Sequence, residues 1–67
     1  MDISQTIKLR RAKLGISQQD LSEFSGVAIS TIKDLERGVG NPSIATLQKL
    51  LEALGLEVII QVKQTIK

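Results

Sequence analysis

The side chains best suited to chemistry stand close together in residues 28–37, where polar and charged groups recur between apolar ones. The segment carries the hydroxyl of Ser30, the positive charges of Lys33 and Arg37, and the carboxylate of Asp34. Groups of these types form hydrogen bonds and ion pairs with a bound partner. We therefore interpret the segment as a surface for recognition.

The composition excludes most kinds of catalytic and metal site. The chain has no histidine, cysteine or tyrosine. It has no glycine-rich phosphate loop, and its acidic residues stand singly, so neither a nucleophile with its base nor a pair of catalytic carboxylates can be assembled. Without thiols and imidazoles it can form neither a disulfide framework nor the common metal sites. We expect a binding protein that is no enzyme and uses no cofactor or metal.

The length of 67 residues predicts one small domain over residues 1–67. A domain of this size buries only about 60% of its unfolded surface, so it often gains stability from a partner chain. The formal net charge of +2 permits a polyanionic partner without requiring one. The chain has no apolar leader and no apolar run near the roughly 20 residues of a membrane span. We expect a cytoplasmic protein without membrane contact.

The middle of the chain predicts two short helices around a tight turn. Ser17 can cap the first helix, and Asp20 suits the third position of a capping box. Leu21 and Phe24 are three residues apart, so we expect both to face inward. Gly26 falls where the helix must stop and the chain reverse, a position that favours a residue free to adopt a positive φ.

The second of these helices keeps much of its surface out of the core. Ile32 and Leu35 form its apolar stripe, and Gly38 supplies its C-terminal stop. Together the two helices predict a helix-turn-helix unit over residues 17–37. The residues left largely outside the core are Ala28, Ile29, Ser30, Thr31, Lys33, Asp34 and Arg37.

One further helix is predicted on each side of this unit. The first spans residues 2–14, with Leu9 off its apolar stripe. The last begins at the N-cap Ser43, after a connector whose glycine and proline rule out a continuing helix. The inward positions of the first helix are Ile3, Ile7 and Leu14. Those of the last helix are Ile44, Leu47, Leu50, Leu51 and Leu54.

The apolar period changes from helical to alternating over residues 56–63, which predicts a short β-strand. A lone strand leaves its backbone groups unpaired, so we expect the strands of two chains to pair antiparallel in a two-fold homodimer. In the alternative, this apolar stripe packs on the helices of its own chain. The predicted dimerisation residues are Leu56, Val58, Ile60 and Val62.

A helix with a free polar face suits the major groove of DNA, which admits one helix and displays distinguishable base edges. The helix over residues 29–37 has such a face. Two alternatives remain open at this point. The helix can be an ordinary amphipathic surface helix, or the domain can be an interaction module that binds a protein.

The sequence resembles the phage repressor and Cro-like helix-turn-helix proteins, also called the Xre family, from about residue 7 to residue 56. This resemblance implies an all-α, four-helix lambda-repressor-like DNA-binding domain that acts as a transcriptional repressor. The matching residues are Arg11, Gly15, Ser17, Gln18, Leu21, Gly26, Val27, Thr31, Ile32, Leu35, Glu36, Arg37, Gly38, Pro42, Ser43, Leu47, Leu54, Gly55 and Leu56.

The resemblance also implies which residues meet the bases of DNA: Ala28, Ile29, Ser30, Lys33 and Asp34. Ala28 or Ile29 suits a thymine methyl group, and Lys33 suits guanine or a phosphate. Asp34 is repelled by phosphates unless it accepts a hydrogen bond from a cytosine amino group, so it either discriminates between bases or faces away. Ala28 departs from the usual serine or threonine of the family.

Further roles are implied by the same resemblance. Arg11 and Glu36 match a partly buried structural ion pair that would set the tilt of the recognition helix. Gln18 matches a glutamine that anchors a phosphate at a helix N-terminus. The residues implied to contact phosphates are Lys8, Gln18, Thr31, Arg37 and Asn41.

A narrower resemblance concerns the connector after residue 38 and the predicted strand, which are similar to HipB-like antitoxins. It implies a dimer that binds a palindromic operator in double-stranded DNA, represses its own operon and holds a HipA-like kinase toxin. The alternative is a phage-type or other Xre repressor that has no toxin partner.

Overall fold

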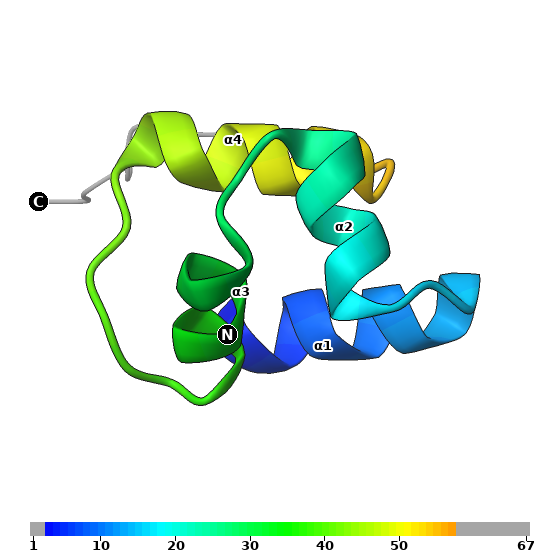
Figure 1. Cartoon of the computed structure of the whole chain (residues 1–67), viewed down its shortest axis with the longest axis horizontal. Helices are drawn as coiled ribbons and strands as arrows, with labels where there is room; N and C mark the ends of the chain where they lie inside the picture. Colours follow the sequence, from blue (N-terminus) through cyan, green and yellow to red (C-terminus); the bar gives the residue numbers. More distant parts are fainter. Residues whose placement is uncertain (1–2, 58–67) are drawn as a thin grey trace, which may run out of the picture.

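The computed structural model describes residues 3–57, and within this range the chain is all-α and contains no strand. It has four helices, α1 (Ile3–Leu14), α2 (Gln18–Ser25), α3 (Ile29–Glu36) and α4 (Ile44–Ala53) (Figure 1). Of the residues predicted to pair in a dimer, only Leu56 is described, and it is in no strand. Val58, Ile60 and Val62 lie outside the described residues.

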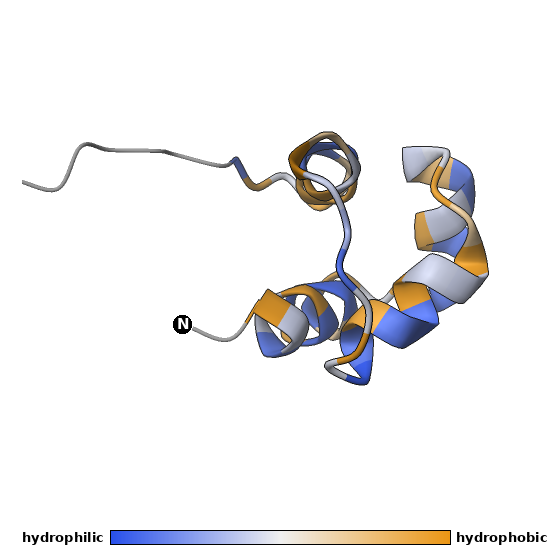
Figure 2. Cartoon of the chain, turned by 90° about the vertical axis from the view of Figure 1, so that its left-hand side faces the viewer, coloured by the Kyte–Doolittle hydropathy of each residue, from blue (hydrophilic) through white to orange (hydrophobic). Residues whose placement is uncertain are grey.

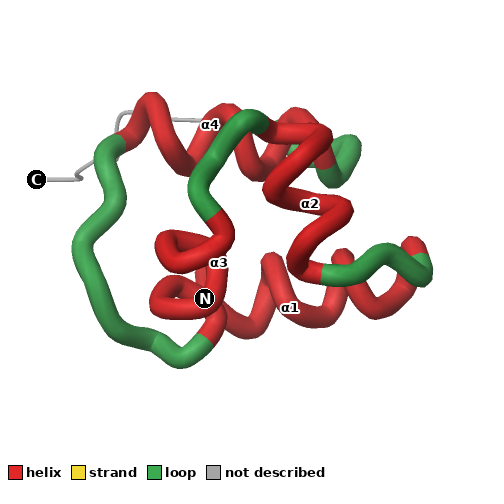
Figure 3. Tube along the Cα trace, viewed as in Figure 1, coloured by secondary structure: helices red, strands yellow, loops and turns green. Residues whose placement is uncertain are grey.

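The helices are joined by short turns, except between α3 and α4, where a longer connector follows Gly38 (Figure 3). α2 packs on both α3 and α4, and α1 packs on α3. Each helix carries both hydrophobic and hydrophilic residues (Figure 2), as helices that bury one face do. The buried core draws on all four helices and consists of Ile7, Leu21, Val27, Ile32, Leu35, Leu50, Leu51 and Leu54.

Three apolar residues that we expected in the core are exposed: Leu14, Phe24 and Ile44. Leu14 is the last residue of α1 and Ile44 the first of α4, so each lies at a helix end. Phe24 is 64% exposed. In α2, which has only eight residues, a spacing of three from Leu21 did not show which side chains face the core.

The buried side of α2 runs from Leu21 toward two serines instead of toward Phe24. Ser22 Oγ donates to the Val27 carbonyl at 2.6 Å, and Ser25 Oγ donates to the Leu21 carbonyl at 2.7 Å. Ser25 also accepts from the Val27 N–H at 3.2 Å. Since Phe24 lies about 100° around the helix from Ser25, it is left on the outer surface.

Local capping fixes both ends of α2. Ser17 and Asp20 form the predicted capping box, in which each side chain accepts from the backbone N–H of the other. Gly26 ends α2 with φ +74°, and its N–H donates to the Ser22 carbonyl at 2.9 Å. Only a residue tolerant of the left-handed conformation fits this position without strain. The left-handed Gly26 thus ends α2 and lets the chain reverse direction before α3 begins at Ile29.

Candidate nucleic-acid interface

α3 packs one face against the core and exposes the other. Ile32 and Leu35 are buried, whereas Ser30, Lys33 and Asp34 are exposed. Because residues three and four apart share a face of a helix, the two buried residues hold α3 to the domain while the opposite face stays free. Of the other residues predicted to meet bases or phosphates from this helix and its flanks, Ala28 and Arg37 are exposed, and Ile29 and Thr31 are partly buried.

The residue before α3 contributes no side-chain cap. Ala28 stands at the N-cap, where its carbonyl accepts from Thr31 and Ile32 at 3.0 and 3.2 Å. A serine or threonine at this position would direct a hydroxyl back to the backbone of the first turn. With alanine, the first turn of α3 presents a methyl group beside its N-terminus.

A hollow of about 430 Å³ lies beside α3 and is lined by residues from α1, α2 and the C-terminal half of α3 with its C-cap, all of them charged except the α2 residue Gln18. We call it the basic hollow. Lys8, Lys33 and Arg37 bring three positive charges to it, and Arg37 also lies 3.5 Å from the carboxylate of Asp34. The hollow thus brings Lys8 and Arg37, which are predicted to contact phosphates, close to Lys33, which is predicted to contact bases. Its lining residues are Lys8, Arg11, Gln18, Lys33, Glu36 and Arg37.

Arg11 and Glu36 form a bidentate ion pair in the wall of the basic hollow. Arg11 Nε donates to Glu36 Oε2 at 2.8 Å, and Arg11 Nη2 donates to Glu36 Oε1 at 2.9 Å. Their side chains are 18% and 5% exposed. Arg11 Nη1 also donates to the Ile16 carbonyl at 3.0 Å, so one guanidinium joins α1, the turn before α2 and the end of α3.

Gln18 belongs to the same cluster, since its Nε2 donates to Glu36 Oε1 at 3.2 Å. Burial acts to raise the pKa of Glu36, but the hydrogen bonds from Arg11 and Gln18 and the charges of Arg11 and Lys8 outweigh it and lower that pKa. The hydrogen bond to Glu36 raises the pKa of Arg11. Glu36 is therefore an anion at neutral pH, and Arg11 neutralises it.

The other flank of α3 has a different character. A hollow of about 330 Å³ there contains Thr31 and Asn41, two of the predicted phosphate contacts, together with the carboxylate of Asp34. The predicted phosphate contacts are thus divided between two flanks of the helix. One flank is strongly cationic, and the other combines hydroxyl and amide groups with a negative charge. The lining residues of this second hollow are Thr31, Asp34, Gly40, Asn41, Pro42 and Thr46.

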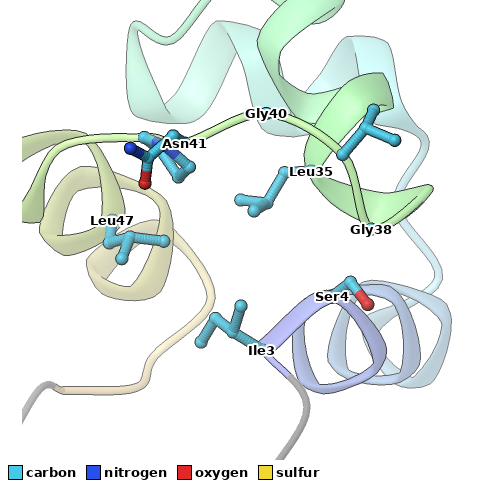
Figure 4. Close-up of a pocket in the computed structure, with 9 residues that line it drawn as sticks. Ile3, Ser4, Leu35, Gly38, Gly40, Asn41 and Leu47 are labelled. Carbon is cyan, nitrogen blue, oxygen red and sulfur yellow. The ribbon is translucent and has the colours of Figure 1, made fainter.

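Sequence reasoning missed an apolar hollow of about 300 Å³ at the C-terminal end of α3. Figure 4 shows Ile3, Leu35 and Leu47 pointing into the space that three helices and the connector enclose. The hollow shares Asn41 and the connector with the second flank of α3. The periodicity of the helices could have indicated the three aliphatic residues, but not the path of the connector beside them.

The two adjacent arginines of α1 point apart, because neighbouring residues in a helix do not share a face. Arg11 turns to Glu36, and Arg10 Nε donates to the Leu54 carbonyl at the end of α4, at a distance of 2.9 Å. Sequence reasoning missed the role of Arg10.

No helix in the described part of the chain is long and apolar enough to cross a membrane.

These features define a class of protein. Two short helices joined by a glycine turn, within a four-helix domain that holds the second helix by one face only, form a helix-turn-helix domain. The sequence profile of the helix-turn-helix family matches residues 7–59. The chain belongs to this family, which confirms the resemblance to repressor and Cro-like proteins.

Several relatives have names that fit this membership. An uncharacterized HTH-type transcriptional regulator of Haemophilus influenzae is 49% identical over 45 residues, which cover 67% of this chain and 46% of the relative. The immunity repressor protein of Bacillus phage phi105 is 36% identical over 58 residues, or 87% of this chain and 40% of the repressor. The regulator y4dJ of Sinorhizobium fredii is 40% identical over 53 residues, or 79% and 68% of the two chains. This chain thus spans less than half the length of the first two.

Proposed function

We propose that this domain is a DNA-binding transcriptional regulator that inserts α3 into the major groove of operator DNA. The observation that carries the proposal is the free polar face of α3 beside the basic hollow. Support also comes from the family, since relatives of this chain are named as HTH-type transcriptional regulators and as a phage immunity repressor.

The charged and polar residues around α3 are of the types that contact phosphates and bases at a protein–DNA interface. Phosphate contacts give affinity and orientation, while contacts to base edges give specificity. In the proposal, bases are read by Ala28, Ile29, Ser30, Lys33 and Asp34. Phosphates are held by Lys8, Gln18 and Arg37 on the cationic flank and by Thr31 and Asn41 on the other flank.

The proposed active form is a homodimer that represses its own operon. Two copies related by a two-fold axis would place their α3 helices about 34 Å apart, so that they read a palindrome with half-sites roughly 10 bp apart or a multiple of that spacing. We propose that residues 56–63 supply the contact between the copies. An isologous contact is self-complementary, which satisfies the backbone of both strands at once.

A narrower form of the proposal adds a HipA-like kinase toxin as partner. Its support is the resemblance of the connector and the C-terminal residues to HipB-like antitoxins, together with Leu9, which is 64% exposed on α1. Since single exposed aliphatic side chains are common on protein surfaces, the exposure of Leu9 makes it available for such a contact, and co-purification decides whether it is one. Co-purification of this domain with the kinase of a neighbouring reading frame would support this form, and its loss in Leu9→Lys would place the contact on α1.

The test begins with a DNA duplex selected by the wild-type domain from a pool of random sequences. Ser30→Ala and Lys33→Gln should each weaken binding to that duplex, with Lys33→Gln by about tenfold, since a good base contact contributes roughly 1–3 kcal/mol. Lys49→Gln removes an exposed charge on α4 outside the basic hollow and serves as the matched control.

Two results would overturn the assignment. If the wild type selects no sequence from the pool, the domain is no sequence-specific DNA reader. If it selects a sequence but Ser30→Ala and Lys33→Gln bind it as tightly as Lys49→Gln does, α3 is not the reading element.

A further inference from the structure

The carboxylate of Glu36 accepts hydrogen bonds from two different residues. Its Oε2 accepts from Arg11 Nε, and its Oε1 accepts from both Arg11 Nη2 and Gln18 Nε2. With only 5% of its side chain exposed, Glu36 relies on these protein donors instead of water. Its position is in turn fixed by the bidentate geometry of Arg11, which is itself tied to the Ile16 carbonyl.

Glu36 thereby decides which way the Gln18 amide points. An ionised carboxylate only accepts hydrogen bonds, whereas an amide group has a donating end and an accepting end. Gln18 must therefore turn its nitrogen toward Glu36, at 3.2 Å. Glu36 uses one of the two N–H bonds of that nitrogen, which leaves the second for another acceptor, and Gln18 is among the residues that line the basic hollow.

The surroundings of this second N–H are suited to an anion. Lys8 and Arg37 line the same hollow, and the charge of Lys8 acts on Glu36. A bare carboxylate in the wall would repel a phosphate, but Arg11 cancels the charge of Glu36 at 2.8 Å. A phosphate in the hollow would thus meet the Gln18 amide together with the cations Lys8 and Arg37.

We propose that Glu36 is a positioning residue for phosphate recognition, because it holds the Gln18 amide with its free N–H turned into the basic hollow beside Lys8 and Arg37. This inference rests on the proposed DNA binding and assigns the ion pair a second role beyond bracing α3. The ligand is a phosphate group of the DNA backbone, and Glu36 itself does not touch it.

The neighbouring glutamine supplies a matched control. Gln19 Nε2 donates to Glu23 Oε1 at 3.4 Å on the exposed side of α2, and Gln19 does not line the basic hollow. With the duplex selected by the wild type, Gln18→Ala should weaken binding about tenfold, since it removes a hydrogen bond to a charged group. Gln19→Ala should bind as the wild type does.

The salt dependence of binding separates the amide from the cations around it. Lys8→Gln and Arg37→Gln should each reduce the slope of log affinity against log salt by about 1, because each removes one charge that displaces a counterion. Gln18→Ala should lower the affinity and leave the slope unchanged, since an amide displaces no counterion. Because a loss of folded protein would also lower the apparent affinity, these affinities are compared under conditions where urea unfolding shows each variant to be folded. A Gln18→Ala affinity equal to that of the wild type under those conditions would contradict the amide contact.

A double-mutant cycle tests the link between Glu36 and Gln18. Glu36→Gln should weaken DNA binding in the wild type by more than in the Gln18→Ala background, because the positioned amide is already absent there. Affinities are compared at a temperature where urea unfolding shows every variant to be folded. Equal losses in both backgrounds would show that Glu36 does not act through Gln18.

The side-chain amide resonances of the wild type give a readout that needs no variant. We expect the two Nε2 protons of Gln18 to differ from those of Gln19, with one shifted by its bond to the carboxylate and the other moving when DNA is added. Gln18 protons that behave like those of Gln19 would overturn the positioning role. A wild type that selects no DNA would instead overturn the proposed function and the phosphate site with it.

Discussion

At the scale of single residues, Glu36 is held by side chains from two other helices. It is almost fully buried, carries a negative charge and receives hydrogen bonds from α1 and from the start of α2. Breaking a buried ion pair by removing one partner costs about 3–5 kcal/mol. The 18% exposure of Arg11 places this pair toward the lower end of that range.

The lowered pKa of Glu36 predicts how stability depends on pH. A carboxyl whose pKa is lower in the folded chain than its ordinary value of 4.5 stabilises the fold fully above that value. This contribution is lost as the pH falls below 4.5 and through the lower folded value. We expect the free energy of unfolding, measured with urea from about pH 7 to about pH 3, to fall over this window. In Glu36→Gln the curve should be flatter, and an equally steep curve would contradict the prediction.

The exposure of Phe24 predicts an unequal response to truncation within α2. Leu21→Ala should lower the free energy of unfolding by about 2–5 kcal/mol, as large-to-small changes in a core do. Phe24→Ala should lower it by less than about 1 kcal/mol, because the ring is 64% exposed. Urea unfolding of both variants makes the comparison. A loss at Phe24 as large as at Leu21 would mean that the ring is covered in solution.

At the scale of the elements, the helix ends decide how α2, α3 and α4 are held. Gly26 and Gly55 both adopt a positive φ, at +74° and +73°. Their surroundings differ, because a Cβ added at Gly26 would meet nothing within 4 Å, whereas one at Gly55 would lie 3.3 Å from Arg10 Nη2. Arg10 is also the residue that holds the Leu54 carbonyl.

This difference predicts unequal costs for alanine at the two glycines. Gly26→Ala should destabilise by about 1–2 kcal/mol from backbone strain alone. Gly55→Ala should cost slightly more, because Arg10 Nη2, 3.3 Å from the added Cβ, would also have to shift by a few tenths of an ångström. In an Arg10→Met background the two substitutions should cost the same, and thermal unfolding can measure all of these variants. A persistent excess at Gly55 would mean that Arg10 is not its cause.

At the scale of the whole molecule, the proposed dimer explains how so small a domain can read a palindrome. Deleting residues 57–67 should convert the dimer to a monomer while α1 to α4 remain folded, because their core lies within residues 7–54. Sedimentation gives the mass, and circular dichroism gives the helix content. A dimer that persists after the deletion would rule out the C-terminal contact.

Much of the fold could be predicted because its signals are local. Caps such as Ser17 and stops such as Gly26 act through neighbouring backbone groups, so four helices with nearly correct ends follow from the order of residues. The free face of α3 follows in the same way from the spacing of Ile32 and Leu35. Phe24 was placed wrongly because two serines take the inner side of α2 through hydrogen bonds to the turn.

The sequence by itself determined the four helices, the glycine turn and the polar face of α3, since each depends on residues within a few positions of one another. Only the tertiary structure decided which distant groups meet. Arg10 and Leu54, whose contact no sequence signal indicated, are 44 positions apart. The ion pair of Arg11 and Glu36, 25 positions apart, was expected from the family resemblance alone and not from the spacing of residues. The basic hollow likewise exists only where α1, α2 and α3 pack together. Contacts of this kind depend on how helices are oriented, which the spacing of residues in one helix does not specify.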